Sequence, residues 1–338
     1  MKEHSSKKII SLSRREFLGK SAAAVTGIAL SSQSALGGAP AFIRNLGKPN
    51  SKFNGVQIGA ITYSWRSLPT NAEQVLKYCI DCNISAIELM GPTAEAFAGA
   101  PHTHTEPMTR GGGRPQISDE ERIARGKEIA AWRSSVSMDK FEQLRKMYKD
   151  AGVSIYAYKP NALGENNTDA EVEYALRAAK ALGASHVTVE LPKSGGQSKR
   201  LGMIADRHRI AVAYHGHLQQ TIDSWDEALS QAKYNGINCD VGHYVAAGFD
   251  PIPLLERKHE HIYSMHLKDR KSKANGGENM PWGEGDTPIV QILQLMRKNK
   301  YKFPATVEME YQVPEGSDAV KEVAKCVEYC RKALEKNS

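Results

Sequence analysis

The sequence predicts an α/β protein of the (β/α)8 TIM-barrel class. Short apolar, β-branched runs alternate with amphipathic helical patterns from about residue 55 to residue 335, and eight such pairs can be counted. Side chains that bind metals stand where the later strands end, and TIM barrels build their active sites at the carboxyl ends of their strands. An open doubly wound sheet would alternate similarly, but ITYSWRS after the first strand lacks the GxGxxG such a sheet normally carries there.

Each expected strand is a short run that a helical pattern follows. The runs cover residues 56–64, 85–91, 154–160, 186–192, 210–217, 237–243, 262–269 and 305–311. The helical pattern DAEVEYALRAAKALG, residues 169–183, has apolar residues at helical spacing and a glycine at its end. Consecutive pairs of this kind place parallel strands side by side, with all their carboxyl ends on one face.

The first 37 residues predict an export signal. A twin-arginine pattern, SLSRREFLG, is followed by the apolar run from Ala22 to Leu30 and by the small residues of a cleavage site, Ala35-Leu36-Gly37. The apolar run is far shorter than the roughly 20 residues of a membrane span. We therefore expect export by the twin-arginine (Tat) machinery, a periplasmic protein without a stable membrane anchor, and a polar linker over residues 38–54.

Charge and cysteine content exclude some classes. Residues 1–37 hold six Lys or Arg and two acids, so a formal +3 of the total +7 remains after cleavage. No basic stripe with interleaved aromatic residues is present, which disfavours nucleic acid as a partner. Cys79 and Cys82 form a CxxC inside an amphipathic helical pattern, and without a second pair they are expected to be buried helix cysteines.

Residues 92–136 interrupt the regular alternation. They contain PHTHTEP and RGGGRP and show no clean apolar period. Long loops inside compact domains are usually functional. We expect a lid or subsite loop on the carboxyl face of the barrel, where His102 and His104 would be exposed loop histidines that are more often solvated than functional.

The ends of the fourth to eighth strands predict a metal site. They bring Glu190, then His215 or His217, then Asp240, His266, and Glu308 or Glu310. A mixed set of carboxylates and imidazoles suits one divalent ion such as Mn, Co, Mg or Zn. Side chains alternate along a strand, so His215 and His217 share a face, as do Glu308 and Glu310, and either member of each pair could be the ligand.

Four segments resemble a known family. YHGHLQQT, CDVGHYVAAGFDP, MHLKDR and VEMEYQVP resemble, in order and spacing, segments of inosose dehydratase (2-keto-myo-inositol dehydratase), within the xylose-isomerase-like sugar phosphate isomerase and epimerase superfamily. The resemblance implies metal ligands at Asp240, His266 and Glu308, or less favourably Glu310. Isomerases and epimerases commonly carry a ligand Glu at the fifth strand, whereas this chain has His215, as the inosose-dehydratase-like branch does. Glu190, one strand earlier, would then supply the missing carboxylate.

The resemblance also implies a function. We expect a metal-dependent lyase or dehydratase that removes the proton next to a ketone and eliminates from a keto sugar or 3-keto-glycoside through an enediolate held by the metal. Exported 3-keto-glycoside lyases are the closer analogy because of the signal. A metal-dependent isomerase or epimerase is the alternative, and a non-catalytic carbohydrate-binding barrel is a third hypothesis. In all three the partner is a small carbohydrate.

Four residues are the expected acids and bases. Glu190, His217 and Glu310 are candidates for moving the proton, and Lys268, two residues after His266 on the same strand face, would bind a hydroxyl or assist the leaving group. Arg270 is expected to be only a loop charge.

Overall fold

Eight parallel strands close into a barrel in the computed structural model, which describes residues 47–108 and 117–335. Each strand pairs with the next along the chain, and the last pairs back with the first through Ile58 and Ala305. The strands are β2 (Val56–Ile61), β3 (Ala86–Met90), β4 (Ser154–Lys159), β5 (His186–Glu190), β6 (Ala211–His215), β7 (Asn235–Asp240), β8 (Ile262–Leu267) and β9 (Ala305–Val307). The predicted TIM barrel is confirmed.

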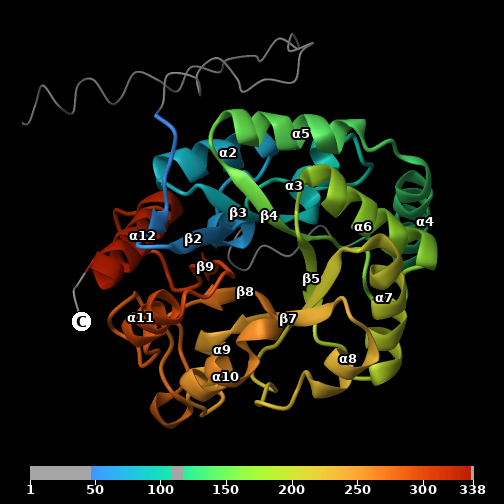
Figure 1. Cartoon of the computed structure of the whole chain (residues 1–338). Coiled ribbons are helices and arrows are strands. Elements are labelled where there is room, and N and C mark those ends of the chain that lie inside the picture. The colour runs from blue at the N-terminus through green and yellow to red at the C-terminus, as the bar shows by residue number, and fades with distance from the viewer. Residues whose placement is uncertain (1–46, 109–116, 336–338) are drawn as a thin grey trace, which may run out of the picture. The chain divides into compact units, whose positions relative to one another are not determined.

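Helices surround this barrel (Figure 1). They are α2 (Ala72–Asp81), α3 (Gly91–Phe97), α4 (Asp119–Ser135), α5 (Asp139–Asp150), α6 (Asp169–Leu182), α7 (Gly195–His208), α8 (Asp226–Gln231), α9 (Val241–Ala246), α10 (Pro251–Lys258), α11 (Ile289–Asn299) and α12 (Ala319–Glu335). In α11 the buried residues Ile289, Ile292, Leu293 and Met296 fall at helical spacing, so one face packs on the barrel and the other faces water.

The strands carry apolar side chains to the helices and polar ones to the barrel interior. In β3, Ile87 and Leu89 belong to the hydrophobic core, whereas Glu88 between them contacts Thr188 of β5 and His266 of β8. Because β3 pairs with neither of those strands, contacts to both place the Glu88 carboxylate inside the barrel. This alternation fills the interior with polar groups.

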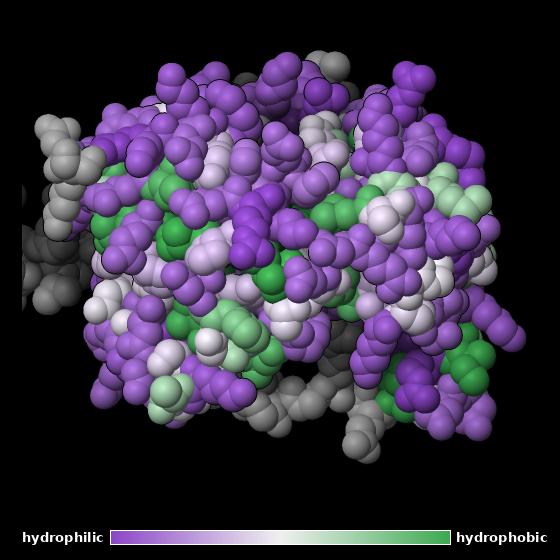
Figure 2. Space-filling view, turned by 60° about the horizontal axis from the view of Figure 1, so that its bottom comes forward, coloured by the Kyte–Doolittle hydropathy of each residue, from purple (hydrophilic) through white to green (hydrophobic). Residues whose placement is uncertain are grey.

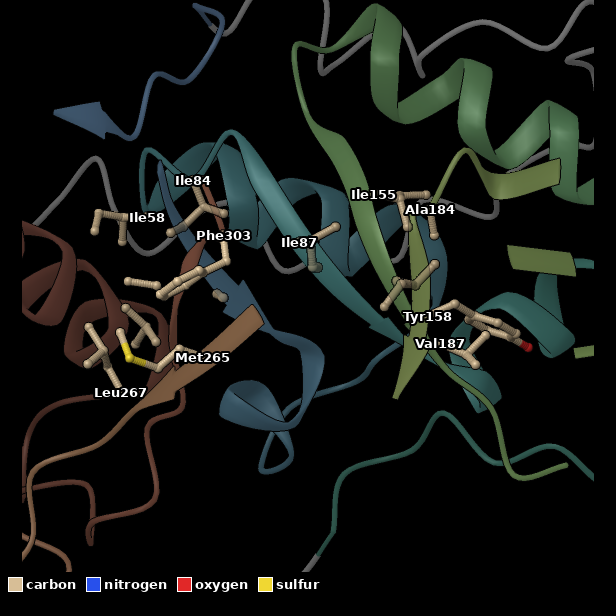
Figure 3. Close-up of a cluster of buried hydrophobic side chains, with 14 of the residues drawn as sticks. Ile58, Ile84, Ile87, Ile155, Tyr158, Ala184, Val187, Met265, Leu267 and Phe303 are labelled. Carbon is tan, nitrogen blue, oxygen red and sulfur yellow. The ribbon is translucent and has the colours of Figure 1, made fainter. Parts of the chain in front are cut away.

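The apolar side chains gather outside the strands. Figure 3 shows Ile155, Ala184 and Val187 together beside β4 and β5. The face turned forward in Figure 2 is mostly hydrophilic, and its hydrophobic side chains form separate patches. Within the described ranges, no helix is both long and apolar enough to span a bilayer. Cys79 and Cys82 are buried at the end of α2 and free, as predicted.

The linker predicted for residues 38–54 ends earlier than expected. Residues 52–53 form a short strand, β1 (Lys52–Phe53), antiparallel to β2. Ser51 is buried, and its hydroxyl donates to the Ile58 carbonyl at 2.6 Å and contacts the Ser85 hydroxyl at 3.0 Å. A polar sequence becomes ordered here because these hydrogen bonds compensate the burial of its polar groups. The predicted signal, residues 1–37, lies outside the described residues.

The insertion predicted as a lid over residues 92–136 is in large part helical. Helix α3 starts at Gly91, and α4 runs for 17 residues after the N-cap Ser118, whose side chain accepts from the Glu121 amide. Arg133 at the end of α4 is buried and forms ion pairs with Glu95 at 2.9 Å and Glu171 at 3.0 Å. The sequence shows no apolar period here because a buried ion pair, not an apolar stripe, anchors this mostly exposed helix.

His102 contacts this helix. Its Nε2 atom lies 2.6 Å from the carboxylate of Glu128 on α4. Residues 109–116, which hold the whole RGGGRP motif, lie outside the described residues.

Candidate metal centre and catalytic cavity

Four buried side chains meet at the carboxyl ends of consecutive strands. His215 ends β6, Asp240 ends β7, His266 lies in β8 and Glu308 directly follows β9. Each offers one nitrogen or oxygen atom, and these four atoms lie within 4.8 Å of one another. The strand registers pair Asp240 with His266 directly, and His266 with Thr306, two residues before Glu308. Adjacent parallel strands with inward side chains of matching register therefore bring the cluster together.

Glu88 orients His266 from the far side of the ring. The Nδ1 atom of His266 lies 2.8 Å from a Glu308 oxygen, and its Nε2 atom lies 2.7 Å from a Glu88 oxygen. The other Glu88 oxygen accepts from the Thr188 hydroxyl at 2.5 Å. The imidazole is thus fixed with Nδ1 toward the cluster. The sequence analysis missed Glu88, although a single acid inside the apolar run AIELM was a signal, because such a carboxylate needs a buried partner.

Asn238 orients the second histidine. The Nδ1 atom of His215 lies 2.6 Å from the Asn238 side-chain oxygen, and the Asn238 amide donates to the Ser264 hydroxyl at 2.7 Å. Nδ1 of His215 therefore carries the proton. Its Nε2 atom, 3.9 Å from an Asp240 oxygen, is left with a free lone pair facing the cluster.

Lys268 brings positive charge to the same place. Its ammonium lies 3.0 Å from Asp240 Oδ2, 2.8 Å from a Glu308 oxygen and 2.6 Å from a Glu310 oxygen. The contact with Asp240 is off the hydrogen-bonding direction, so Oδ2 is buried without a hydrogen-bond partner among the described residues. An unsatisfied buried carboxylate oxygen is costly unless a further group reaches it.

The charges in this cluster are strongly coupled. Burial lowers the pKa of His215 well below its usual value, with help from the charges of His266 and Lys159, which keeps this ring neutral. Burial also opposes charging of His266, but the carboxylates of Glu308 and Glu88 outweigh it and raise its pKa to about 10. Burial opposes ionisation of Glu308 as well, and the positive charges of Lys268 and His266 hold its pKa well below the normal range. The carboxylates thus keep a proton on His266, while Glu308 stays ionised and His215 stays neutral.

These features fit a divalent cation. The cluster offers a mixed set of nitrogen and oxygen donors, which suits a divalent ion such as Mn, Co or Zn. The nitrogens belong to the neutral ring of His215 and to His266, whose other nitrogen contacts Glu88, and the oxygens belong to Asp240 and Glu308. Metal-binding histidines characteristically donate their other N–H to a carboxylate or carbonyl, as the arrangement of His266 and Glu88 allows. The Asp240 oxygen that lacks a hydrogen bond is the atom that a cation would satisfy.

A cavity of about 290 Å³ opens beside the cluster. His215, Lys268 and Glu308 line its floor, and Glu190 and Glu310 line it from opposite sides. The two acids belong to β5 and to the end of β9, four strands apart in an eight-stranded barrel, which places them across the axis from each other. A small polar ligand in this cavity would contact the cluster and both acids.

Glu190 is held at the rim of the cavity. One of its oxygens accepts from the Lys159 ammonium at 3.0 Å, and the other lies 3.3 Å from His217 Nε2. The side chains of Glu190 and His217 are 54% and 50% exposed, so both are reachable by ligand. Glu190 lies outside the buried group of four. Its carboxylate is therefore placed to contact a molecule in the cavity and not to bind a metal ion within the cluster.

His243 faces the same cavity with a fixed tautomer. Arg270 donates to its Nδ1 atom at 2.5 Å, and burial, together with the charges of Lys268 and Arg270, lowers its pKa to about 3. The ring is therefore neutral with its proton on Nε2, where it can donate a hydrogen bond to a ligand. Arg270, which we expected to be only a loop charge, instead positions His243.

The structure separates the pairs that sequence left open. His215 and Glu308 belong to the buried group of four with Asp240 and His266, whereas His217 and Glu310 line the cavity above it. His217 also forms a second, less buried group of possible metal-binding residues with His215 and His243. Each pair shares a strand face, but the second member lies beyond the end of its strand. We therefore favour His215 and Glu308 as the ligands, because they alone of the two pairs lie in the fully buried group.

Comparison with known proteins agrees with this geometry. The family model described as xylose isomerase-like TIM barrel matches residues 124–330, more than half of the chain. The chain belongs to this family. The matched region includes β5 to β9, which carry the four clustered residues.

Curated relatives cover part of the chain. The inosose dehydratase of Mesomycoplasma hyopneumoniae (strain 7448) is 28% identical over 156 residues, which is 40% of this chain and 52% of that protein. The inosose dehydratase of Clostridium beijerinckii is 27% identical over 132 residues, 33% of this chain and 44% of that protein. The chain thus spans about half the length of the curated relatives it matches.

Solved structures share the fold over most of the chain. The probable 3-DHS dehydratase AsbF of Bacillus anthracis superposes with a TM-score of 0.57 at 16% identity, over 84% of this chain and 100% of that one. The 3-keto-D-glucoside 4-epimerase YcjR of E. coli superposes with a TM-score of 0.56 at 12% identity, over 82% of this chain and 99% of that one. At these identities the similarity shows the barrel alone.

The role of Glu88 can be tested by metal binding. Glu88→Gln keeps the shape of the side chain but removes the charge that holds His266, so we expect manganese affinity to fall roughly 10- to 100-fold. Calorimetric titration of metal-free protein measures this. The matched control is Glu322→Gln, which changes another buried glutamate, bonded to the Tyr311 hydroxyl at 2.9 Å, and should leave affinity unchanged. Wild-type affinity in Glu88→Gln would contradict the assignment.

Proposed function

We propose that this chain is a divalent-metal-dependent lyase that removes the proton next to the ketone of a keto sugar or 3-keto-glycoside and expels the group one carbon further on. The observation that carries the proposal is the buried cluster of His215, Asp240, His266 and Glu308 beneath a cavity lined by two acids and a lysine. The partial similarity to inosose dehydratases supports a dehydratase-type reaction.

The first step is proton abstraction. A divalent ion bound by the four clustered residues would polarise a ketone oxygen and acidify the hydrogen on the neighbouring carbon. Glu190 is the base we assign, because its carboxylate is exposed to the cavity and held by Lys159 and His217. His243 donates a hydrogen bond from Nε2 to a substrate oxygen.

The second step expels the leaving group. The electron pair of the broken C–H bond forms a carbon–carbon double bond as the adjacent C–O bond breaks. The departing oxygen needs a proton, and we assign the Lys268 ammonium, which lines the cavity with Glu190 and lies 2.6 Å from Glu310, as the donor. Burial favours loss of this proton, but the carboxylates of Asp240, Glu308 and Glu310 outweigh it and raise the pKa of Lys268, so a cation that draws Asp240 and Glu308 away would make Lys268 a stronger acid. The products are an unsaturated keto sugar and an alcohol or water.

An epimerase is the second candidate, and one observation favours it. Glu190 and Glu310 approach the cavity from strands four apart, so one could remove a proton from one face of a carbon and the other return a proton to the opposite face. The fold similarity to a 3-keto-D-glucoside 4-epimerase is compatible with this reaction.

Proton NMR in deuterated water tests the two reactions together. The manganese-loaded protein is incubated with a 3-keto-glucoside. The lyase proposal predicts release of the aglycone with an unsaturated or hydrated keto sugar. Deuterium uptake into an epimer with an intact glycosidic bond would instead assign the epimerase, and an unchanged substrate would refute both.

A variant at Lys268 tests the effect on turnover separately from the effect on metal binding. Lys268→Met removes the proton donor but adds no ligand, so the protein should retain its metal while kcat falls by roughly 10²- to 10⁴-fold. Metal content and single-substrate kinetics measure the two effects. The control Lys271→Met, three residues on, changes a lysine bonded to the Glu284 carbonyl and should behave as wild type. A Lys268→Met enzyme with unchanged kcat would remove Lys268 from the mechanism.

We also propose export by the twin-arginine route to the periplasm, on the strength of the SLSRREFLG pattern. Replacing Arg14 and Arg15 by lysine should hold the protein in the cytoplasmic fraction of a cell with a twin-arginine system. Detection of the double variant in the periplasm at wild-type level would overturn this proposal.

A further inference from the structure

A second, larger cavity adjoins the catalytic one. Its volume is about 610 Å³, twice that of the cavity above the cluster, and Tyr63 and Glu310 line both. Tyr63 lies in the short 3-10 helix directly after β2, and Glu310 follows β9. The two cavities therefore meet at the same end of the barrel, with the Glu310 carboxylate at their boundary.

The catalytic cavity alone is small. At about 290 Å³ it stands at the lower limit of ligand pockets, which span roughly 300–1,000 Å³. It has room for one sugar ring over the cluster. Any larger substituent on that ring must leave the cavity, and the second cavity is the neighbouring space, since Tyr63 and Glu310 line both.

The second cavity is suited to an uncharged, partly apolar group. Its wall combines apolar side chains, including Leu68, Val313 and Tyr311, with hydroxyls such as Ser67. Its two carboxylates are in ion pairs, Glu310 with Lys268 at 2.6 Å, and its one arginine, Arg66, donates to backbone carbonyls. The Asp318 carboxylate lies 2.8 Å from Lys321. The cavity therefore offers a ligand mainly apolar surface and hydroxyl groups for hydrogen bonds.

Arg66 and Tyr63 contact each other in the wall of this cavity. The Arg66 guanidinium lies 4.6 Å from the centre of the Tyr63 ring, in the range of a cation–π contact. The same guanidinium donates to the carbonyls of Met309 at 2.7 Å and Glu310 at 3.2 Å. These bonds hold the Arg66 guanidinium beside the Tyr63 ring, so the cavity wall includes an aromatic ring and a guanidinium against which a planar group can pack.

We propose that this second cavity is the leaving-group subsite of the enzyme and that it takes the aglycone of a keto-glycoside, with preference for an aromatic aglycone. This inference rests on the proposed lyase function, because it assumes that the sugar ring occupies the smaller cavity. It assigns Tyr63, Arg66 and Val313, which the reaction itself does not require, to substrate selection.

The wild-type enzyme gives the first test. Its kcat and KM are measured for phenyl 3-keto-β-D-glucoside and for methyl 3-keto-β-D-glucoside, which present the same ring to the cluster. Because phenolate leaves more easily than methoxide and so raises kcat by itself, the comparison that reports the subsite is KM, and an aglycone subsite predicts a KM at least tenfold lower for the phenyl compound. Equal KM values for the two compounds would overturn the proposal.

A variant that fills the cavity gives the second test. Val313 is half-buried in the loop after β9, and Val313→Trp places a large ring in the subsite. The phenyl-to-methyl ratio of kcat/KM should then fall at least tenfold. The matched control is Val136→Trp, since Val136 is also a half-buried loop valine that packs on the core but does not line this cavity. The ratio should stay at its wild-type value there, and a ratio unchanged in Val313→Trp contradicts the subsite.

A binding measurement separates failure of the subsite from failure of the proposed reaction. Phenyl β-D-glucoside, which lacks the ketone and is not eliminated, is titrated calorimetrically into the manganese-loaded protein. Binding that Val313→Trp weakens tenfold, in a protein that turns over no keto-glycoside, would refute the lyase function and retain the subsite. If both keto-glycosides are turned over and Val313→Trp changes their kcat/KM values by the same factor, the subsite is refuted and the lyase function is retained.

Discussion

Buried negative charge at one end of the barrel is the constraint on which this site depends. Glu88, Asp240 and Glu308 are nearly inaccessible to water, and Glu310 lies beside them. Carboxylates in such a place are stable only with positive charge close by. Lys268 and a protonated His266 supply some of it, yet one Asp240 oxygen still lacks a hydrogen bond among the described residues. A divalent cation would supply positive charge to the same carboxylates, and the Lys268 ammonium would then be free to contact a ligand in the cavity.

The regular alternation of the strands creates this constraint. Each strand that delivers a charged residue to the interior also delivers apolar neighbours to the core, as Glu88 does between Ile87 and Leu89. Packing of the apolar neighbours in the core thereby fixes the register of each strand, because a shift by one residue would turn the interior side chains outward. Residues just past the strand ends, such as His217 and Glu310, escape that restriction and line the cavity where a ligand can reach them. The barrel thus presents a buried layer of candidate metal ligands and, above it, an accessible layer of polar side chains.

Much of the fold and part of the site could be predicted from the sequence. The eight strands follow from their apolar runs, and the residues that end consecutive strands predict a metal site with Asp240, His266 and one member each of His215/His217 and Glu308/Glu310. The sequence left those two choices open and added Glu190, which lies outside the buried group of four. Three features could not be predicted. Glu88 meets His266 across 178 residues, Arg270 positions His243 across 27, and α4 is anchored by the buried ion pairs of Arg133. Each depends on a single polar contact made by tertiary structure, and such contacts leave no periodic signal in the chain.

We propose that His215, Asp240, His266 and Glu308 hold a metal ion. Anomalous diffraction from a crystal grown with manganese tests it most directly. We expect one strong anomalous peak at roughly 2.0–2.3 Å from a nitrogen of each histidine and from oxygens of Asp240 and Glu308, with the Lys268 ammonium moved away from the two carboxylates. A crystal with saturating manganese that shows no peak there, and Lys268 still in contact with Asp240 and Glu308, would contradict the claim.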